Sequence, residues 1–428
     1  MSTLIQEVRQ RGERLFERHG IPHTRLEHWK YTDIRRAIEP WLAEKADVSP
    51  GSGYEALPTD DVAFQGIDGL DAYRIRVLDG RVIEIPEALP EGVIVQPLAR
   101  LLADDEARAA RILNADEQAS LFNGLVALNT ARAQDGVVIT VEAGIELARP
   151  ILIQHMGHAQ AAHICHALEL GAQAHAMVIE HYETPEQTAG FTNVVSRVQL
   201  GSGSSLVHVR LQQESSARMH IGRLDVCQQR DSLLKSHVIT LGAQTSRLDL
   251  VVNLNEAGAS CELNGLYLTA GRQHADHHTV IEHRAPYCRS REEYRGILDG
   301  RSRAVFNGRV VVHEGAVGTD SEQRNANLLL SDRAEIDTKP ELEIYNDDVR
   351  CAHGATVGQL DEAQLFYMKA RGLDDSQARE LLTFAFADEV LVRLDVSAVR
   401  RHIERLSFDK LPYAGDFDAM SLGLEESA

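Results

Sequence analysis

The sequence contains few cysteines for its length, and none of them is close to another. Five occur in 428 residues, at positions 165, 227, 261, 288 and 351, with no C-x-x-C arrangement. An odd number of widely spaced cysteines is a poor disulfide framework, so we expect a reducing, cytoplasmic location. Without a C-x-x-C pair, the chain alone cannot supply a standard four-cysteine zinc or iron–sulfur site.

The signatures of common enzymes are also missing. No lysine follows a glycine, which excludes the Walker A loop and the nucleotide hydrolysis that depends on it. Neither a G-x-S-x-G sequence nor an H-E-x-x-H sequence occurs, which excludes the commonest hydrolase elbow and the zinc-protease helix. The chain therefore has little of the equipment that catalysis needs.

Positive charge and long apolar runs are scarce as well. The chain has 44 lysines and arginines against 64 aspartates and glutamates, a formal net charge of −20. Such an acidic chain is a poor partner for nucleic-acid phosphates or anionic membrane surfaces. No apolar run approaches the roughly 18–20 residues that span a bilayer, and the charged N-terminus is unlike a signal peptide. We expect neither nucleic acid nor a membrane as a partner.

The long middle of the chain, residues 136–360, consists of short β-rich runs separated by small turn residues. No helical pattern interrupts them, which argues against the usual α/β folds. A parallel β-helix fits these runs best, because its coils stack apolar residues inward and turn at small residues. A jelly roll or a β-sandwich remains the alternative from the pattern alone.

The two ends of the chain have a different character. Residues 1–135 are predicted to form an N-terminal helical and mixed domain, with a β-hairpin that turns at Asp79 and Gly80. Residues 361–428 are predicted to form a C-terminal helical domain, because Asp361 and Asp374 each stand three residues before a glutamine, as in a capping box. We therefore expect a mainly β fold with helices at both ends.

Histidine is abundant, and two groups invite a metal site. The groups are His155, His158, His163 and His166, and then His274, His277, His278 and His283. In a strand, residues i and i+2 share a face, so Asp276 and His278 could converge. Polar ladders in the coils of a solenoid account for such residues without a metal, and we favour that interpretation. The four cysteines that precede Cys351 are likewise expected to be buried packing residues.

One cysteine and one histidine have a more suggestive context. They lie in the segment NDDVRCAHGATVGQ, residues 346–359, just after a clear strand pattern. Extended geometry puts Cys351 and His353 on one face, where a thiolate and an imidazole suit iron, zinc or copper. Asp347 and Asp348 could hydrogen-bond a ligand. We predict Cys351 and His353 as metal ligands, and since two ligands make at most half a tetrahedral site, the rest must come from another chain or a substrate.

Long segments of the sequence resemble the SufB/SufD family of iron–sulfur cluster assembly proteins. They are NANLLLSDRAEIDTKPELEIYNDDVRCAHGATVGQLDEAQLFYMKARGL, the following ARELLTFAFADEVL, and PHTRLEHWKYT near the N-terminus. LPEGVIVQPL and FNGLVALNTARAQDG fit as well, so the resemblance covers nearly the whole chain. The SufB branch typically has an acidic residue where Gly354 follows His353, and an upstream scaffold cysteine. No cysteine lies between Cys288 and Cys351 here, so the SufD branch is the better match.

The resemblance implies a fold, partners and a site. It implies a right-handed parallel β-helix between helical terminal domains and no enzymatic activity in this chain. The ATPase SufC would dock on the C-terminal helices, and SufB would pair through the β-helix, although an isolated chain could pair with itself. At the SufB interface, a SufB cysteine faces a histidine that His353 matches, and Cys351 matches a neighbouring family cysteine. Iron, or a transient cluster shared with SufB, would bind there, with none held permanently.

Two other classes of function remain open from the sequence. One is a β-helix enzyme that acts on polysaccharide, with acidic residues in a lateral groove; cleavage of glycans by the purified chain would favour it. The other is a purely structural platform without a metal role. Normal cluster assembly by His353→Ala and Cys351→Ala variants would favour that platform.

Overall fold

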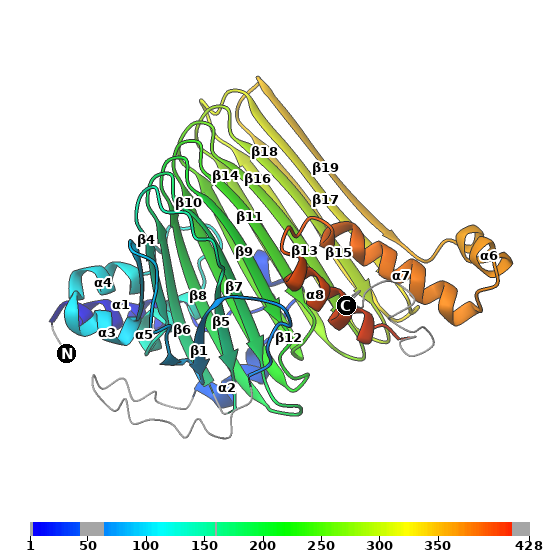
Figure 1. The fold of residues 1–428 in the computed structure, drawn as a ribbon, viewed down its shortest axis with the longest axis horizontal. Helices are drawn as coiled ribbons and strands as arrows, with labels where there is room; N and C mark the ends of the chain where they lie inside the picture. Colours follow the sequence, from blue (N-terminus) through cyan, green and yellow to red (C-terminus); the bar gives the residue numbers. More distant parts are fainter. Residues whose placement is uncertain (1–2, 43–63, 159–160, 413–428) are drawn as a thin grey trace.

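The chain folds as a parallel β-solenoid with helices at both ends (Figure 1), seen in a computed structural model that describes residues 3–42, 64–158 and 161–412. After residue 136, consecutive strands alternate between two sheets that face each other, so each pair of strands makes one coil. Nearly all neighbours within a sheet are parallel and in register. The mainly β fold with helical ends is therefore confirmed, and parallel pairing excludes the jelly roll and the sandwich.

The first sheet has ten strands. In spatial order they are β19 (Val349–Gly358), β17 (Thr319–Leu329), β15 (Arg289–Leu298), β13 (Ser260–Thr269), β11 (Leu233–Thr240), β9 (Ser205–Gln212), β7 (His175–Glu183), β5 (Ile151–Met156), β1 (Tyr73–Leu78) and β2 (Arg81–Glu84). The pair β1–β2 is the antiparallel hairpin predicted at Asp79 and Gly80, which both take a positive φ. The hairpin closes the sheet at the N-terminal end of the solenoid.

The second sheet has nine strands. They are β18 (Glu335–Ile344), β16 (Arg303–Val312), β14 (His274–His283), β12 (Thr245–Leu254), β10 (Arg218–Gln228), β8 (Gly190–Leu200), β6 (Ala161–Leu170), β4 (Val137–Val141) and β3 (Val93–Pro97). The strands β1 to β3 thus extend both sheets, although they belong to the part of the chain that precedes residue 136. The last strands of the two sheets, β18 and β19, form the opposite end.

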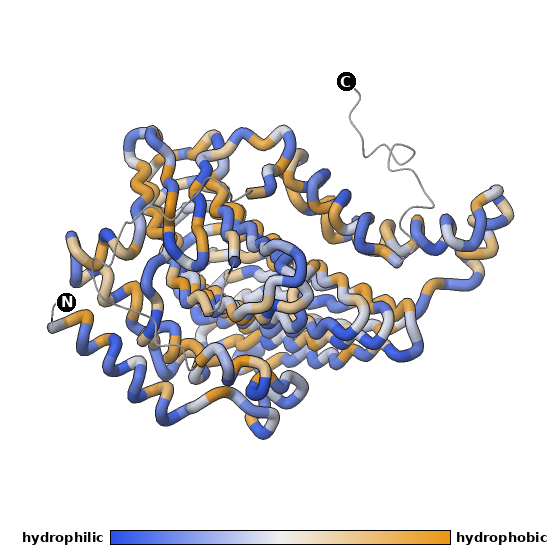
Figure 2. Tube along the Cα trace, turned by 90° about the horizontal axis from the view of Figure 1, so that it is seen from below, coloured by the Kyte–Doolittle hydropathy of each residue, from blue (hydrophilic) through white to orange (hydrophobic). Residues whose placement is uncertain are grey.

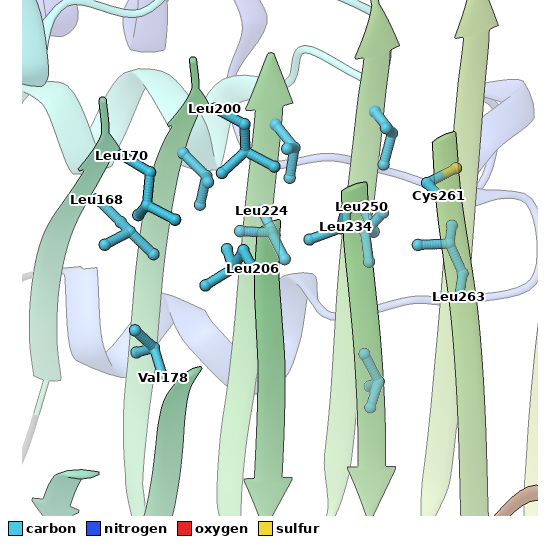
Figure 3. Packing of buried hydrophobic residues seen from close by; sticks show 14 of the residues in the cluster. Leu168, Leu170, Val178, Leu200, Leu206, Leu224, Leu234, Leu250, Cys261 and Leu263 are labelled. Atoms are coloured by element: carbon cyan, nitrogen blue, oxygen red, sulfur yellow. The ribbon is translucent and has the colours of Figure 1, made fainter. Parts of the chain in front are cut away.

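The core of the solenoid lies between the two sheets. In-register strands place like side chains above one another, as Leu170 and Leu200 or Leu224 and Leu250 show (Figure 3). Burial of each such side chain stabilises the fold by on the order of 2 kcal/mol. Cys261 and Cys288 are buried in this core, Cys165 is buried beneath the N-terminal helices, and Cys227 is half-buried.

The N-terminal helices cover the outer face of the second sheet (Figure 1). They are α1 (Thr3–His19), the 3-10 turn η1 (Glu27–Trp29), α2 (Arg35–Leu42), α3 (Leu98–Asp104), α4 (Glu106–Leu113) and α5 (Gly124–Arg132). Glycine lets α1 approach α5 closely: a Cβ on Gly12 would lie 2.7 Å from the backbone nitrogen of Ala131. Trp29 and Ile34 pack with Phe191 of β8 in the same layer.

The C-terminal helices lie on the other side, against the first sheet. They are α6 (Glu362–Ala370), α7 (Asp375–Leu391) and α8 (Ser397–Asp409). Apolar residues of α7 and α8 pack on the outer face of the sheet, while α6 stands clear of the solenoid (Figure 2). The capping box at Asp374 and Gln377 is complete. At the start of α6, the side chain of Asp361 accepts hydrogen bonds from the backbone N–H groups of Ala363 and Gln364. Residues 413–428 of the predicted C-terminal domain lie outside the described residues.

Candidate functional site

The end of the solenoid formed by β18 and β19 is open. Each strand is the last of its sheet and pairs with one neighbour only, β16 or β17, within the described part of the chain. Most residues of β19 are exposed and most of β18 are half-buried. Such edges present unpaired backbone N–H and C=O groups to any strand that approaches. The fold therefore ends on a surface suited to a further pair of strands.

Cys351 and His353 lie on β19 and face into the solenoid. Their register partners on β17 are Ser321 and Gln323, which are both buried between the sheets. Side chains alternate along a strand and stack between in-register neighbours, so Cys351 and His353 share the inward face. Cys351 is half-buried and packs against the core, while His353 is exposed at the mouth. The pair therefore lies at the open end with one side free.

The thiol of Cys351 is held in its neutral form. Burial is the largest cause and raises its pKa, a hydrogen bond from the Ser321 backbone opposes this, and the nearby charge of Asp320 raises it further. The thiolate is the form that ligates metals. These surroundings therefore favour the neutral thiol of Cys351 over its thiolate.

The two aspartates that precede the strand are not brought to His353. Asp347 and Asp348 lie in the turn between β18 and β19, at the start of the edge strand. At about 3.3 Å per residue, the backbone of Asp348 is roughly 17 Å from that of His353. Within this chain, these carboxylates therefore lie too far from His353 to support a metal bound there, as the sequence had predicted they could.

No complete metal site is formed by this chain as described. Residues 3–42, 64–158 and 161–412 contain no group of three or more His, Cys, Asp or Glu side chains that could hold a metal ion. Cys351 and His353 together supply a thiol and an imidazole, which is half of a tetrahedral set at most. A metal bound by these two residues would need further ligands from outside the described residues.

The first histidine group is divided by the strand alternation. His155 and His166 face the interior, with 5.1 Å between their ring centres, and the Nδ1 of His166 accepts a hydrogen bond from the backbone of Val137. Burial lowers the pKa of His166 to about 4. His163 is buried on the other face, against Phe191, and His158 is exposed. The group is thus divided between the interior, the outer face and the surface, and only His155 and His166 lie together.

The second group is divided in the same way. His277 and His283 face the interior, whereas Asp276 and His278 lie together on the outer face, with 3.0 Å between Asp276 Oδ1 and His278 Nε2. The predicted convergence of these two is confirmed. The positive charge beside Asp276 is supplied by Arg247, whose Nη1 lies 2.6 Å from Asp276 Oδ2. Burial alone would raise the pKa of Asp276, but Arg247 and His278 hold it well below its usual range.

Sequence reasoning missed the polar interior below the open end. Polar side chains also face inward in earlier coils, as Glu180 and Arg210 do, and β15 and β17 carry a run of them next to the open end. They are Ser290, Glu292, Ser321, Gln323, Asn325 and Asn327. The alternation of polar residues in SEQRNAN was a signal for it, but a strand exposed on that face would have given the same pattern.

A groove of about 720 Å³ adjoins the open end on the C-terminal side. It lies between the ends of β17 and β19 and the helices α6 and α7, and its apolar lining includes Val357, Leu360, Tyr367 and Phe386. Phe366 on α6 is 72% exposed and Tyr367 is 55% exposed. Because large aromatic side chains at such exposure mark contact surfaces, this region is a second candidate for a partner. None of the described helices is long and apolar enough to cross a membrane.

Comparison with known families decides what kind of protein carries this site. The description "SUF system FeS cluster assembly, SufBD core domain" matches residues 152–386, and "SufBD protein N-terminal region" matches residues 1–153. The chain belongs to the SufBD family. The first match contains nearly all of the solenoid, including Cys351 and His353, and the second contains the motif around Trp29.

Relatives within the SufBD family cover almost the whole chain. The iron-sulfur cluster assembly protein SufD of Escherichia coli (strain K12) is 31% identical over 402 residues, which are 92% of this chain and 90% of that protein. A SufBD family protein of Synechocystis sp. (strain PCC 6803) is 30% identical over 94% of this chain and 90% of its own length. The SufD protein of Bacillus subtilis (strain 168) is 22% identical over 89% and 87%. These similarities agree with the SufD branch.

Proposed function

We propose that this chain is a non-catalytic scaffold subunit for iron–sulfur cluster assembly in the cytoplasm. It pairs with SufB through the open end of the solenoid and binds the ATPase SufC through its C-terminal helices. Iron, or a nascent cluster, is cargo held briefly between this chain and SufB, with His353 as the main ligand and Cys351 beside it. The observation that carries the proposal is that Cys351 and His353, two potential metal ligands, both face inward on an edge strand with a neighbour on one side only.

The incomplete ligand set supports a shared site. His353 is exposed at the mouth and Cys351 is half-buried beside it, so a partner placed against β19 reaches both. Iron accepts mixed imidazole and thiolate ligands, and thiolates dominate cluster sites. Ligands from the facing subunit complete the coordination, and when that subunit leaves, the cargo is released because half a site holds it only weakly.

The edges of β18 and β19 support pairing with another solenoid. A strand added to each edge satisfies the exposed backbone groups and continues the two sheets. Ile344, Tyr345 and Val357 are exposed near these edges, at 42%, 60% and 50%, and lose water contact in such a pair. The same surface accounts for a homodimer of the isolated chain, which SufB replaces.

The helices α6 and α7 support binding of the ATPase. The chain has no Walker A loop, so any work driven by nucleotide hydrolysis comes from a partner. Phe366 and Tyr367 are exposed on α6, which stands clear of the solenoid, and the adjacent groove reaches Val357 of the edge strand. A partner bound there touches both the helices and the open end, so its movement transmits to the site.

The test is anaerobic co-purification with SufB and SufC, with iron and acid-labile sulfide measured in the complex. We expect His353→Ala to lower bound iron at least about 10-fold while the three proteins still co-purify. Cys351→Ala should have a smaller effect in the same direction. His175→Ala is the matched control, because His175 is an exposed histidine on β7, far from the open end.

Each alternative gives a different outcome. If neither His353→Ala nor Cys351→Ala changes the iron and sulfide content, the metal role is wrong and a purely structural platform remains. Failure of SufC to co-purify with the wild type overturns the partner assignment. Glycan cleavage by the purified chain would instead support the polysaccharide-acting enzyme.

A further inference from the structure

The polar interior below the open end forms a column that ends at His353. On the first sheet, Leu263 of β13 pairs with Glu292 of β15, which pairs with Gln323 of β17, which pairs with His353 of β19. Same-face side chains of in-register neighbours are about 4.8 Å apart. Ser236 and His208 continue the same column below Leu263, so Leu263 is an apolar interruption in a largely polar column. The two side chains directly below His353 both form hydrogen bonds.

The side-chain amide of Gln323 is fixed from two directions. Its Nε2 donates a hydrogen bond to Oε2 of Glu292, at 2.6 Å. Gly308 of the facing sheet makes room for it, since a Cβ there would lie 2.2 Å from that Nε2. The nitrogen of Gln323 therefore points toward Glu292, and an ionised Glu292, which can only accept hydrogen bonds, favours this orientation.

The other end of the same amide has no hydrogen-bond partner. Oε1 of Gln323 is buried and unpaired within the described residues, and the residue as a whole is only 1% exposed. A buried acceptor without a donor costs roughly 1–3 kcal/mol, so it calls for an explanation. The side-chain oxygen of the neighbouring Asn325 is not unpaired, because its Oδ1 accepts hydrogen bonds from Asn327 and Thr338.

His353 is the next residue in the column and brings the missing donor. An imidazole that binds a metal through one nitrogen carries a hydrogen on the other, and that N–H needs an acceptor. We propose that Gln323 is the positioning residue for His353: its side-chain carbonyl accepts the ring N–H and leaves the second nitrogen free for iron. Glu292 is the group that holds the amide in this orientation. The inference rests on the proposed role of His353 as an iron ligand.

The arrangement gives His353 properties that a histidine without such a partner lacks. The hydrogen bond fixes one tautomer and one ring orientation. Loss of such an outer partner typically weakens metal binding 10- to 100-fold. Gln323 therefore acts through His353 and does not touch the iron.

The test compares two substitutions at Gln323 in the full-length chain. Gln323→Met keeps the length but removes the acceptor, whereas Gln323→Glu keeps an acceptor. The probe is Co²⁺ alone, titrated anaerobically and followed by its visible absorption. We expect Gln323→Met to raise the dissociation constant about 10-fold and Gln323→Glu to leave it within about 3-fold of wild type. Gln228→Met is the matched control, because Gln228 is a buried, inward-facing glutamine of β10, bonded to Ser232.

A spectroscopic measurement separates positioning from packing. In a chain labelled with ¹⁵N-histidine, the signal of His353 is identified by its loss in His353→Ala. We expect the wild type and Gln323→Glu to show one dominant tautomer, and Gln323→Met to show a mixture of both. Equal tautomer patterns in the wild type and Gln323→Met overturn the inference, and so does an equal loss of Co²⁺ affinity in Gln228→Met.

The outcomes also distinguish this inference from the proposed function. If His353→Ala abolishes Co²⁺ binding while Gln323→Met binds like wild type, the positioning role is wrong and the ligand role stands. If His353→Ala binds Co²⁺ like wild type, the ligand role is wrong, and the tautomer pattern alone then decides whether Gln323 accepts from His353.

Discussion

The indole ring of Trp29 lies over the guanidinium group of Arg247, with 3.8 Å between the ring centre and Cζ. Arg247 is fully buried and also bonds Asp249, Asp276 and the backbone carbonyl of His28. One arginine on β12 thus binds the N-terminal segment and neutralises two buried carboxylates. This contact gives a structural reason for the tryptophan in the N-terminal motif.

Removal of Trp29 should therefore be costly. We expect Trp29→Ala to lower the free energy of unfolding by about 3–5 kcal/mol, because it leaves a cavity and exposes a buried ion cluster. Urea unfolding followed by circular dichroism measures this. Lys30→Ala, a change at the adjacent exposed residue, should alter stability by no more than about 0.5 kcal/mol. A similar loss in both variants would contradict the role of the stacked pair.

Glycines in the solenoid interior make room for tyrosines of neighbouring coils. A Cβ on Gly296 would lie 2.1 Å from Cε2 of Tyr267. We expect Gly296→Ala to destabilise the protein by about 1–3 kcal/mol through overpacking. Gly354→Ala on the edge strand is the control, since no described atom lies within 4 Å of its added Cβ. Thermal unfolding of the two variants compares them, and equal melting temperatures would show that the interior tolerates the extra methyl group.

Glu292 should make stability depend on pH. Burial raises its pKa to about 7, against the lowering effect of hydrogen bonds from Thr279 and Gln323. Between about pH 4.5 and pH 7 the unfolded chain has released this proton and the folded chain retains it. The contribution of Glu292 is therefore fully present below pH 4.5 and is lost as pH rises to 7, by up to about 1.4 kcal/mol per unit.

A neutral replacement removes this dependence. We expect Glu292→Gln to be more stable than the wild type at pH 8, by about 2–3 kcal/mol, and to lose the advantage near pH 4.5. Urea unfolding at pH 5, 6, 7 and 8 tests the trend. Glu186→Gln, at an exposed position after β7, serves as the control. A constant difference between wild type and Glu292→Gln at all four values would show that Glu292 is ionised in the folded state throughout.

The exposed aromatic residues of α6 should matter for partner binding and little for folding. Phe366 has 72% of its surface exposed, so Phe366→Asp should change the melting temperature by no more than about 2 °C. We expect it to weaken capture of SufC at least about 10-fold in an affinity measurement with purified proteins. Ile94→Asp, at an exposed apolar position on β3 away from these helices, should capture SufC like the wild type. Equal capture by Phe366→Asp and the wild type would show that SufC binds at a different surface.

The sequence predicted the local elements well because their signals are local. The hairpin at Asp79 and Gly80 requires two positive φ values, which an aspartate and a glycine accept. The capping box at Asp374 and Gln377 is set by residues three apart. The absence of helical patterns between residues 136 and 360, together with small residues at the turns, was enough to favour a parallel solenoid. The family resemblance rested on long unbroken segments, and the comparisons confirm it.

The tertiary structure decided which residues meet. Strand alternation is visible in the sequence, but the face that points inward is set by packing of the whole sheet. His277 and His278 are adjacent in the chain, yet one faces the interior and the other binds Asp276 on the outside. Gln323 and His353 are a full coil apart, and only the in-register pairing of β17 with β19 places one above the other. Likewise, the sequence predicted Cys351 and His353 as half of a metal site, and the fold places these two residues on an edge strand that has a neighbour, β17, on one side only.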